Sequence, residues 1–298
     1  MSSAALDIDR PLGSFLEAIQ RRLTRLNDSR LCPRWEPVLS LHEELELREQ
    51  EITFLEAERA RISEQAAGAP EDPTQFLSWY EGLRETGPGQ NDPLFPWLAE
   101  QATLSQVVWF LAQEVAGEAG FDDLVALTQI GMPVRPKLEM AANYWDEMGR
   151  GHESGMHGPM LDRLASALKV REANHPIVWQ SIALGNLLVG LAANRRYAYH
   201  SIGALGVVEL TAPGRATCVD QALKRLGVAA KPRQYYALHA TLDIRHSESW
   251  NREVLEPLVR ENPLVARPIA EGALMRLNAG ARCFERYRQE LGVSPPSS

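Results

Sequence analysis

Apolar residues recur at helical spacing along most of the chain. Within residues 12–28, Phe15, Ile19, Leu23 and Leu26 follow one another at steps of three and four, the period that puts side chains on one face of an α-helix. No stretch alternates apolar and polar residues between tight turns, as a half-buried strand would. The pattern therefore predicts an all-α protein, a helical bundle.

Turn-forming residues divide the predicted helices into two groups. The Gly- and Pro-rich stretches 68–73 and 85–93 separate the first helices from the rest, so we expect an N-terminal helical arm over residues 1–70 and a helical domain over residues 71–298. Pro213-Gly214 is expected to end a helix. The predicted helices cover residues 12–28, 39–65, 93–119, 122–130, 135–149, 158–171, 177–193, 195–211, 215–226, 232–248, 250–261 and 263–291.

Composition and charge exclude several classes of protein. The 298 residues carry 31 Lys and Arg against 39 Asp and Glu, a net charge of -8, with no run of five basic residues, which argues against a nucleic-acid or anionic-membrane binder. Cys32, Cys218 and Cys283 form no CxxC pair and suit free thiols in a reducing compartment. The N-terminus lacks the basic start and apolar core of a signal peptide, and the apolar stretch 177–193 contains Gln180 and is interpreted as a buried helix. We therefore expect a cytoplasmic protein without a membrane or nucleic-acid partner.

The segment HATLDIRH, residues 239–246, is the first candidate site. Offsets of four and seven place His239, Asp243 and His246 within about 60° of one another on a helix. Tyr235 and Leu242 are among the apolar neighbours, a setting in which polar groups need partners. A metal ion is one such partner. A surface stripe or hydrogen-bonded core residues would explain the triplet equally well.

Two further segments each offer metal-ligating side chains. Glu147 lies at the end of a predicted helix, and His157 follows a Gly-rich loop just before Pro159, which suits the first turn of the next helix. The loop would also be compatible with a simple turn. Glu209 follows a charge-free stretch, residues 202–208, where an unpaired carboxylate would be rare. At a helix end, it would instead reach solvent.

Taken in chain order, the series Glu147, His157, Glu209, His239, Asp243 and His246 resembles the haem-oxygenase-like di-iron oxidases and oxygenases, the iron-containing redox enzymes. The resemblance covers about residues 93–250 and fills all six ligand positions of that family. It implies a haem-oxygenase-like helical bundle, two Fe ions per chain held by these six side chains, and O2 as co-substrate. Haem is disfavoured, because it would need one proximal His rather than an acidic cluster.

Some members of the family add a carboxylate from an earlier helix. Glu114 is the candidate here, with Glu118 as its rival, and the sequence does not choose between them. Glu114 follows Phe110 by four residues, so both would lie on one face of a helix.

The resemblance implies N-oxygenation, desaturation or C–C cleavage of a small metabolite that bears an amine or a carboxylate. Arg195, Arg196 and Arg233 are candidates for holding a substrate carboxylate, although each is also explained as a surface arginine. We expect a small-molecule substrate, an external electron donor and a homodimer. The alternatives are a single-metal or metal-free helical enzyme of related fold, and a non-enzymatic helical protein whose arm mediates assembly.

Overall fold

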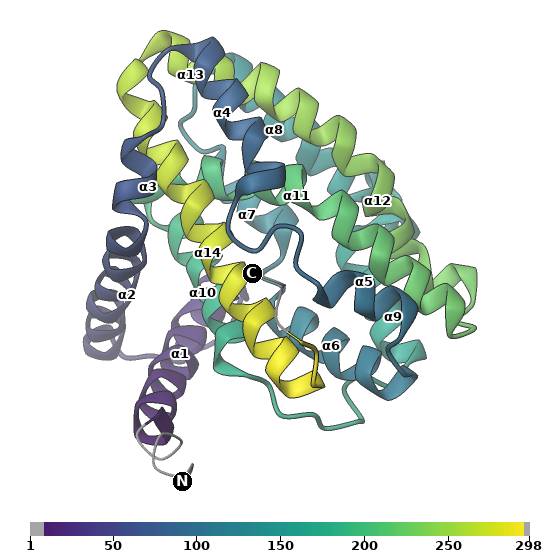
Figure 1. The fold of residues 1–298 in the computed structure, drawn as a ribbon. Helices are drawn as coiled ribbons and strands as arrows, with labels where there is room; N and C mark the ends of the chain where they lie inside the picture. The colour runs from purple at the N-terminus through teal and green to yellow at the C-terminus, as the bar shows by residue number, and fades with distance from the viewer. Residues whose placement is uncertain (1–8, 295–298) are drawn as a thin grey trace, which may run out of the picture.

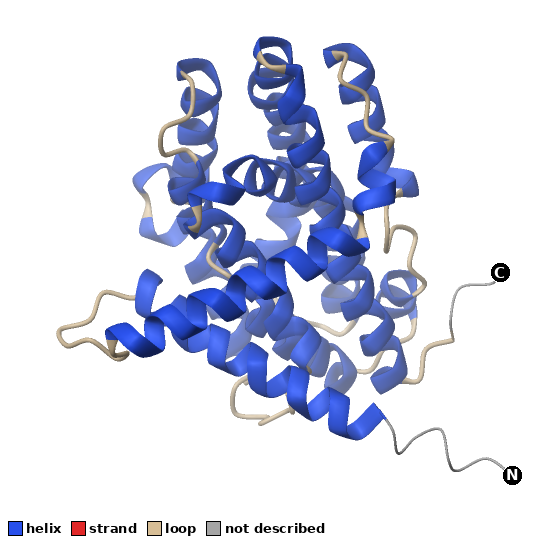
Figure 2. Ribbon diagram, turned by 90° about the vertical axis from the view of Figure 1, so that its left-hand side faces the viewer, coloured by secondary structure: helices blue, strands red, loops and turns tan. Residues whose placement is uncertain are grey.

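The computed structural model describes residues 9–294 and consists of α-helices with no strand in that range (Figure 2). The prediction of an all-α protein is confirmed. The first residues of the N-terminal segment inspected for a signal peptide lie outside the described residues. Between residues 9 and 294, no helix combines the length and apolarity needed to cross a membrane.

Fourteen α-helices make up the described part of the chain (Figure 1). They are α1 (Asp9–Leu31), α2 (Leu41–Arg61), α3 (Ser63–Ala67), α4 (Pro73–Thr86), α5 (Leu94–Glu100), α6 (Leu104–Gly117), α7 (Phe121–Thr128), α8 (Val134–Glu147), α9 (His157–Ala167), α10 (Trp179–Ala193), α11 (Ala198–Arg225), α12 (Ala230–Trp250), α13 (Glu256–Glu261) and α14 (Ala266–Leu291).

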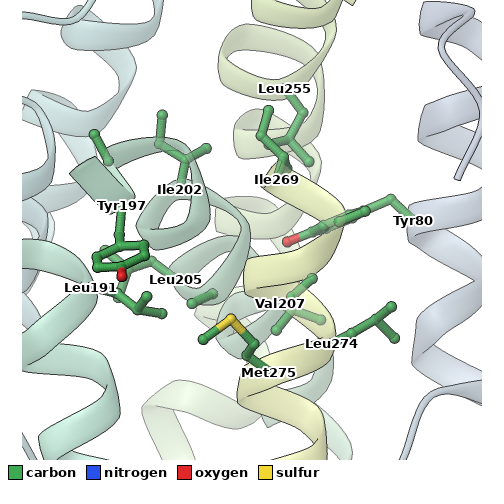
Figure 3. Packing of buried hydrophobic residues seen from close by; sticks show 14 of the residues in the cluster. Tyr80, Leu191, Tyr197, Ile202, Leu205, Val207, Leu255, Ile269, Leu274 and Met275 are labelled. Atoms are coloured by element: carbon green, nitrogen blue, oxygen red, sulfur yellow. The ribbon is translucent and has the colours of Figure 1, made fainter. Parts of the chain in front are cut away.

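Helix α11 is the centre of the bundle and packs on both α12 and α14 (Figure 1). Glycines allow the approach of α14, because a Cβ added at Gly203 would lie 1.8 Å from the carbonyl oxygen of Ile269. Tyr80 of α4 donates a hydrogen bond of 2.7 Å to the carbonyl of Gly203. Around this contact, Leu205 and Met275 belong to the main apolar core (Figure 3). The core therefore fixes α11, which carries Glu209.

The two N-terminal helices pack on the remainder of the bundle. The amide of Asn186 in α10 donates to the backbone oxygen of Gln20 at 2.8 Å, and its Oδ1 accepts from Asn27 at 2.9 Å. Helix α2 is joined to α14 by an ion pair of 2.6 Å between Glu58 and Arg282. The arm thus contacts the main body through buried polar groups, and its boundary at residue 70 stays a prediction.

Side-chain caps explain where the helices depart from the predicted ranges. The helix predicted over residues 93–119 is two helices, because Thr103 and Gln106 form a capping box that starts α6. Helix α4 was not predicted. It begins after Asp72, whose carboxylate accepts hydrogen bonds from two backbone N–H groups.

The prediction that Pro213-Gly214 ends a helix is wrong, since α11 runs unbroken from Ala198 to Arg225. Proline has no N–H, so the carbonyl of Glu209 lacks its usual donor four residues later. Packing on α12 and α14 holds the helix together through this position.

Candidate metal centre

The loop between α8 and α9 brings Glu147 and His157 into contact. Glu147 ends α8 and His157 begins α9, and an isolated antiparallel bridge closes the loop between them. The closure needs glycine at position 149, which has φ of +61°, and whose added Cβ would lie 2.3 Å from the backbone of Gly155. As a result, Glu147 Oε2 lies 2.5 Å from His157 Nδ1.

Helices α11 and α12 supply the other predicted ligands. Glu209 lies in the middle of α11 and is buried. His246 of α12 has its Nδ1 atom 3.4 Å from Glu209 Oε1 and 4.0 Å from Glu147 Oε1. Two helical turns before His246 on α12, the ring of His239 lies 4.6 Å from the ring of His157, centroid to centroid. The predicted stripe on this helix therefore faces the α8–α9 loop.

These side chains form two metal-capable groups that share one carboxylate. In the first, ligand atoms of Glu147, His157 and His239 all lie within 4.8 Å of one another. In the second, the same holds for Glu147, Glu209 and His246.

Asp243 belongs to neither group, but the charges of Glu209 and Glu147 act on it. It is buried, and its Oδ1 atom has no hydrogen-bond partner among the described residues. Burial and then the charges of Glu209 and Glu147 raise the pKa of Asp243 well above its usual value. The structure thus brings the six predicted residues to one place, with five of them within ligand distance of a partner.

Neighbouring groups orient three of these side chains. Asn143 donates to Glu209 Oε1 at 2.7 Å, and Asp146 pairs with His246 Nε2 at 3.3 Å, which leaves His246 Nδ1 facing the carboxylates. The backbone carbonyl of Tyr235 accepts from His239 Nδ1 at 2.7 Å, so the Nε2 lone pair of His239 is free. Carboxylates and carbonyls commonly orient metal-binding imidazoles in this way. Sequence reasoning missed the contacts of Asn143 and Asp146 because they join separate helices, whereas the contact of Tyr235 with His239 lies within α12.

The imidazoles differ in protonation. Burial, with the nearby charge of His246, lowers the pKa of His157 to about 4, and burial next to His157 lowers that of His239 to about 4. Burial also opposes charge on His246, but hydrogen bonding to Glu209 and Asp146 and the carboxylate charges outweigh it and raise its pKa to about 9. At neutral pH, His157 and His239 are therefore neutral and offer lone pairs.

Burial also favours the neutral form of a carboxyl group, but for an acid this raises the pKa. Burial and then the charge of Glu209 raise the pKa of Glu147 well above its usual value. Like charges held close together in a poorly solvated site disfavour ionisation. The cluster has an excess of acidic groups that a cation would stabilise.

A cavity of about 200 Å³ borders this cluster. Its wall contains Glu147, His157, Glu209, His239 and Asp243, together with apolar and charged residues of α5, α6, α9 and α14. Both Glu114 and its rival Glu118 line the cavity, but neither belongs to the two metal-capable groups. The choice between them as a further ligand stays open.

The arginines proposed from the sequence to hold a substrate do not line this cavity. Arg195 donates to the backbone carbonyls of Leu127 and Thr128 at 3.2 and 3.3 Å, and Arg233 pairs with Asp220. Arg196 is exposed. The interpretation as surface residues therefore holds for Arg195 and Arg196, whereas Arg233 is half-buried in its ion pair.

Two other arginines, Arg215 of α11 and Arg276 of α14, do line the cavity. Sequence reasoning missed both of them. A basic residue just after the Pro213-Gly214 pair was the available signal, but that pair was interpreted as a helix end.

The sequence model of the family described as iron-containing redox enzymes matches residues 108–281. This is more than half of the chain, so the protein belongs to that family, and every residue predicted as a ligand lies inside the match. The resemblance found from the sequence is confirmed. No curated protein matches the chain.

Proposed function

We propose that the protein is a non-haem di-iron enzyme that uses O2 to oxidise a small molecule bound in the cavity. The observation that carries the proposal is the pair of three-residue groups joined at Glu147. A carboxylate shared between two ligand groups is the arrangement expected where two metal ions lie side by side.

The chemistry of the residues fits a cation. Glu147 Oε2 and His157 Nδ1 are 2.5 Å apart, yet His157 Nδ1 makes no hydrogen bond. A carboxylate oxygen and an imidazole nitrogen held this close, without hydrogen-bond geometry between them, suit a shared metal ion. The buried Oδ1 atom of Asp243, which has no hydrogen-bond partner among the described residues, gives the same indication.

On this proposal, Glu147, His157 and His239 would hold one iron, and Glu147, Glu209 and His246 would hold the other. Asp243 would be the sixth ligand. Carboxylates and imidazoles are the donors that suit non-haem iron. When bound, the irons supply the redox chemistry that activates O2.

The protein's own residues position the ligands and enclose the substrate. Asn143 and Asp146 hold Glu209 and His246, and the carbonyl of Tyr235 fixes the tautomer of His239. Apolar side chains around the cavity limit the access of water to the reacting groups. The reaction classes proposed are N-oxygenation, desaturation and C–C cleavage, with electrons from an external donor.

Metal content tests the proposal directly. The chain should bind about two irons after anaerobic loading with ferrous ion and should then consume O2. Combined His239→Ala and Asp243→Ala substitutions should lower the iron content while the helical circular dichroism stays unchanged. A matched control is His152→Ala, because His152 is exposed in the α8–α9 loop and lies outside both groups.

The outcomes separate the rival functions. One ion per chain would favour a single-metal enzyme, and a folded protein that binds no iron would refute the di-iron proposal. Unchanged iron content in the double variant would refute the assignment of its ligands. The expected homodimer is a separate proposal, which light scattering of the full chain tests.

A further inference from the structure

Two arginines in the cavity wall have no paired counter-ion. Arg215 makes one hydrogen bond, 3.0 Å long, to Thr211 Oγ1. Arg276 Nε is buried and has no hydrogen-bond partner. Over residues 9–294, no carboxylate lies within ion-pair distance of either guanidinium, although both border the cavity.

This arrangement is costly for the protein alone. Burial lowers the pKa of Arg215 and that of Arg276, although arginine stays protonated at neutral pH because its ordinary pKa is so high. Each guanidinium offers five N–H donors, both side chains are half-buried, and a partly desolvated cation without an anion is destabilising. An anionic ligand would satisfy both groups at once.

The nearby acidic side chains do not take this role. The charge of Glu114 acts on both arginines, while Glu118 acts on Arg276 and Asp243 acts on Arg215. All three carboxylates are too far away to form an ion pair. They moderate the positive charge and leave both guanidinium groups without a carboxylate partner.

We propose that Arg215 and Arg276 bind the carboxylate of a small amphipathic substrate. Guanidinium groups form paired, charge-assisted hydrogen bonds with carboxylates. That this substrate reacts at iron rests on the function proposed above. The anion site itself does not depend on that function.

The cavity wall also fits the rest of such a ligand. Phe95 and Phe284 pack edge to face with ring centroids 4.9 Å apart, and Phe110 packs edge to face on Phe95 at 6.3 Å. The guanidinium of Arg215 lies over the ring of Phe284, 5.5 Å from its centroid, which holds the cation against an apolar surface. Apolar walls around a few charged groups are typical of small-molecule sites.

The two ends of the cavity give the ligand an orientation. Arg215 follows Glu209 by six residues on α11, a rise of about 9 Å along the helix. The charges that act most on Arg276 come from α14, from Glu114 of α6 and from Glu118 just after that helix, rather than from the Glu147 and His157 loop. With its carboxylate between the arginines, the ligand presents a different part of its body to the metal cluster.

Calorimetric titration of metal-free protein tests the anion site. Metal-free protein is used because a carboxylate also binds iron directly. The probe is phenylacetate, with the neutral phenylacetamide and the cationic phenethylamine as matched compounds. The variants are R215Q, R276Q and their combination. R286Q serves as the control, because Arg286 lies on α14 and its ion pair is with Glu290, away from the cavity.

We expect phenylacetate to bind at least about tenfold more tightly than phenylacetamide, the effect of one charge-assisted hydrogen bond or more. Each single variant should lose about tenfold in phenylacetate affinity, and the double variant should lose the preference for the acid. R286Q should match the wild type. Circular dichroism and the melting temperature show that the variants fold, and R276K, which keeps the charge without the fork, provides a second measurement with an intermediate loss.

Three results would overturn the inference. They are equal affinity of the wild type for the acid and the amide, an unchanged preference for the acid in the double variant, and a preference for phenethylamine that E114Q removes. Iron content of the same variants is measured separately. Loss of acid binding with about two irons retained supports the anion site and the metal site independently, whereas failure to load iron refutes only the proposed function.

Discussion

Replacing Glu147 by Gln should stabilise the metal-free protein, because this residue holds a carboxyl group next to another acid. Ligand atoms of Glu147 and Glu209 lie within 4.8 Å of each other, a separation at which two ionised carboxylates repel by roughly 3 kcal/mol at an effective dielectric constant near 20. Keeping one Glu protonated at pH 7 costs about the same. Since protonated His246 offsets part of the charge, we expect E147Q to gain about 1 to 3 kcal/mol in free energy of unfolding.

The pH dependence of stability tests a second time whether the carboxyl group of Glu147 destabilises the metal-free protein. Burial and the charge of Glu209 raise the pKa of Glu147, so the folded protein binds a proton there that the unfolded chain has already released. The stability of the metal-free wild type should therefore fall as pH rises above 4.5, the ordinary pKa of a glutamate. E147Q lacks this titrating group and should show a flatter profile.

Denaturant unfolding of chelator-treated protein at several pH values measures both effects. The same unfolding series is then repeated after anaerobic ferrous loading. Metal should stabilise the wild type, and E147Q should lose that stabilisation because Glu147 belongs to both metal-capable groups. E153Q, which changes an exposed acid of the α8–α9 loop, should behave as the wild type. A metal-free E147Q no more stable than the wild type at pH 7, or one that binds two irons, would refute the reasoning.

Two further substitutions test the frame around the site. Gly203→Ala should destabilise the protein by roughly 3 kcal/mol or more, because its Cβ would lie 1.8 Å from the Ile269 carbonyl oxygen. Gly214→Ala on the same helix meets open space and should be neutral or stabilising by up to about 1 kcal/mol. Denaturant unfolding compares the two variants, and equal effects would contradict the packing argument. Burial alone would raise the pKa of Glu271, but hydrogen bonds from His200 and two arginines lower it to about 2, so its contribution is present above pH 4.5 and is lost as pH falls toward 2. Glu271→Gln should therefore remove about 3 kcal/mol at pH 6 but little at pH 2, and an acid-unfolding curve parallel to that of the wild type would argue against it.

Much of the geometry of the candidate site was predictable because its residues follow local rules. The spacing of His239, Asp243 and His246 is fixed by the helix itself, so one face carries all three once α12 forms. Glu147 and His157 were predictable as neighbours because only a short Gly-rich loop separates two helices. Helical periodicity also sufficed for the fold class.

Features that depend on contacts between distant helices were not predictable. Pro213 is a helix breaker by local propensity, yet packing on both sides of α11 keeps it inside a long helix. The split between α5 and α6 depends on the side-chain cap at Thr103, which the continuous apolar pattern conceals. Arg276 is 61 positions from Arg215 in the sequence, and only the packing of α14 on α11 brings both to one cavity.

The charges in the cavity connect the two proposals. Burial and then the charges of Glu209 and Glu147 raise the pKa of Asp243, and Arg215 lowers it, so the guanidinium already compensates part of the acidic cluster in the metal-free protein. Cations held by that cluster would take over this compensation and leave Arg215 and Arg276 as excess positive charge at the other end of the cavity. A bound carboxylate would then restore the balance. On the proposed assignments, metal and acid therefore increase each other's affinity, and because linkage is reciprocal, the same factor applies in both directions.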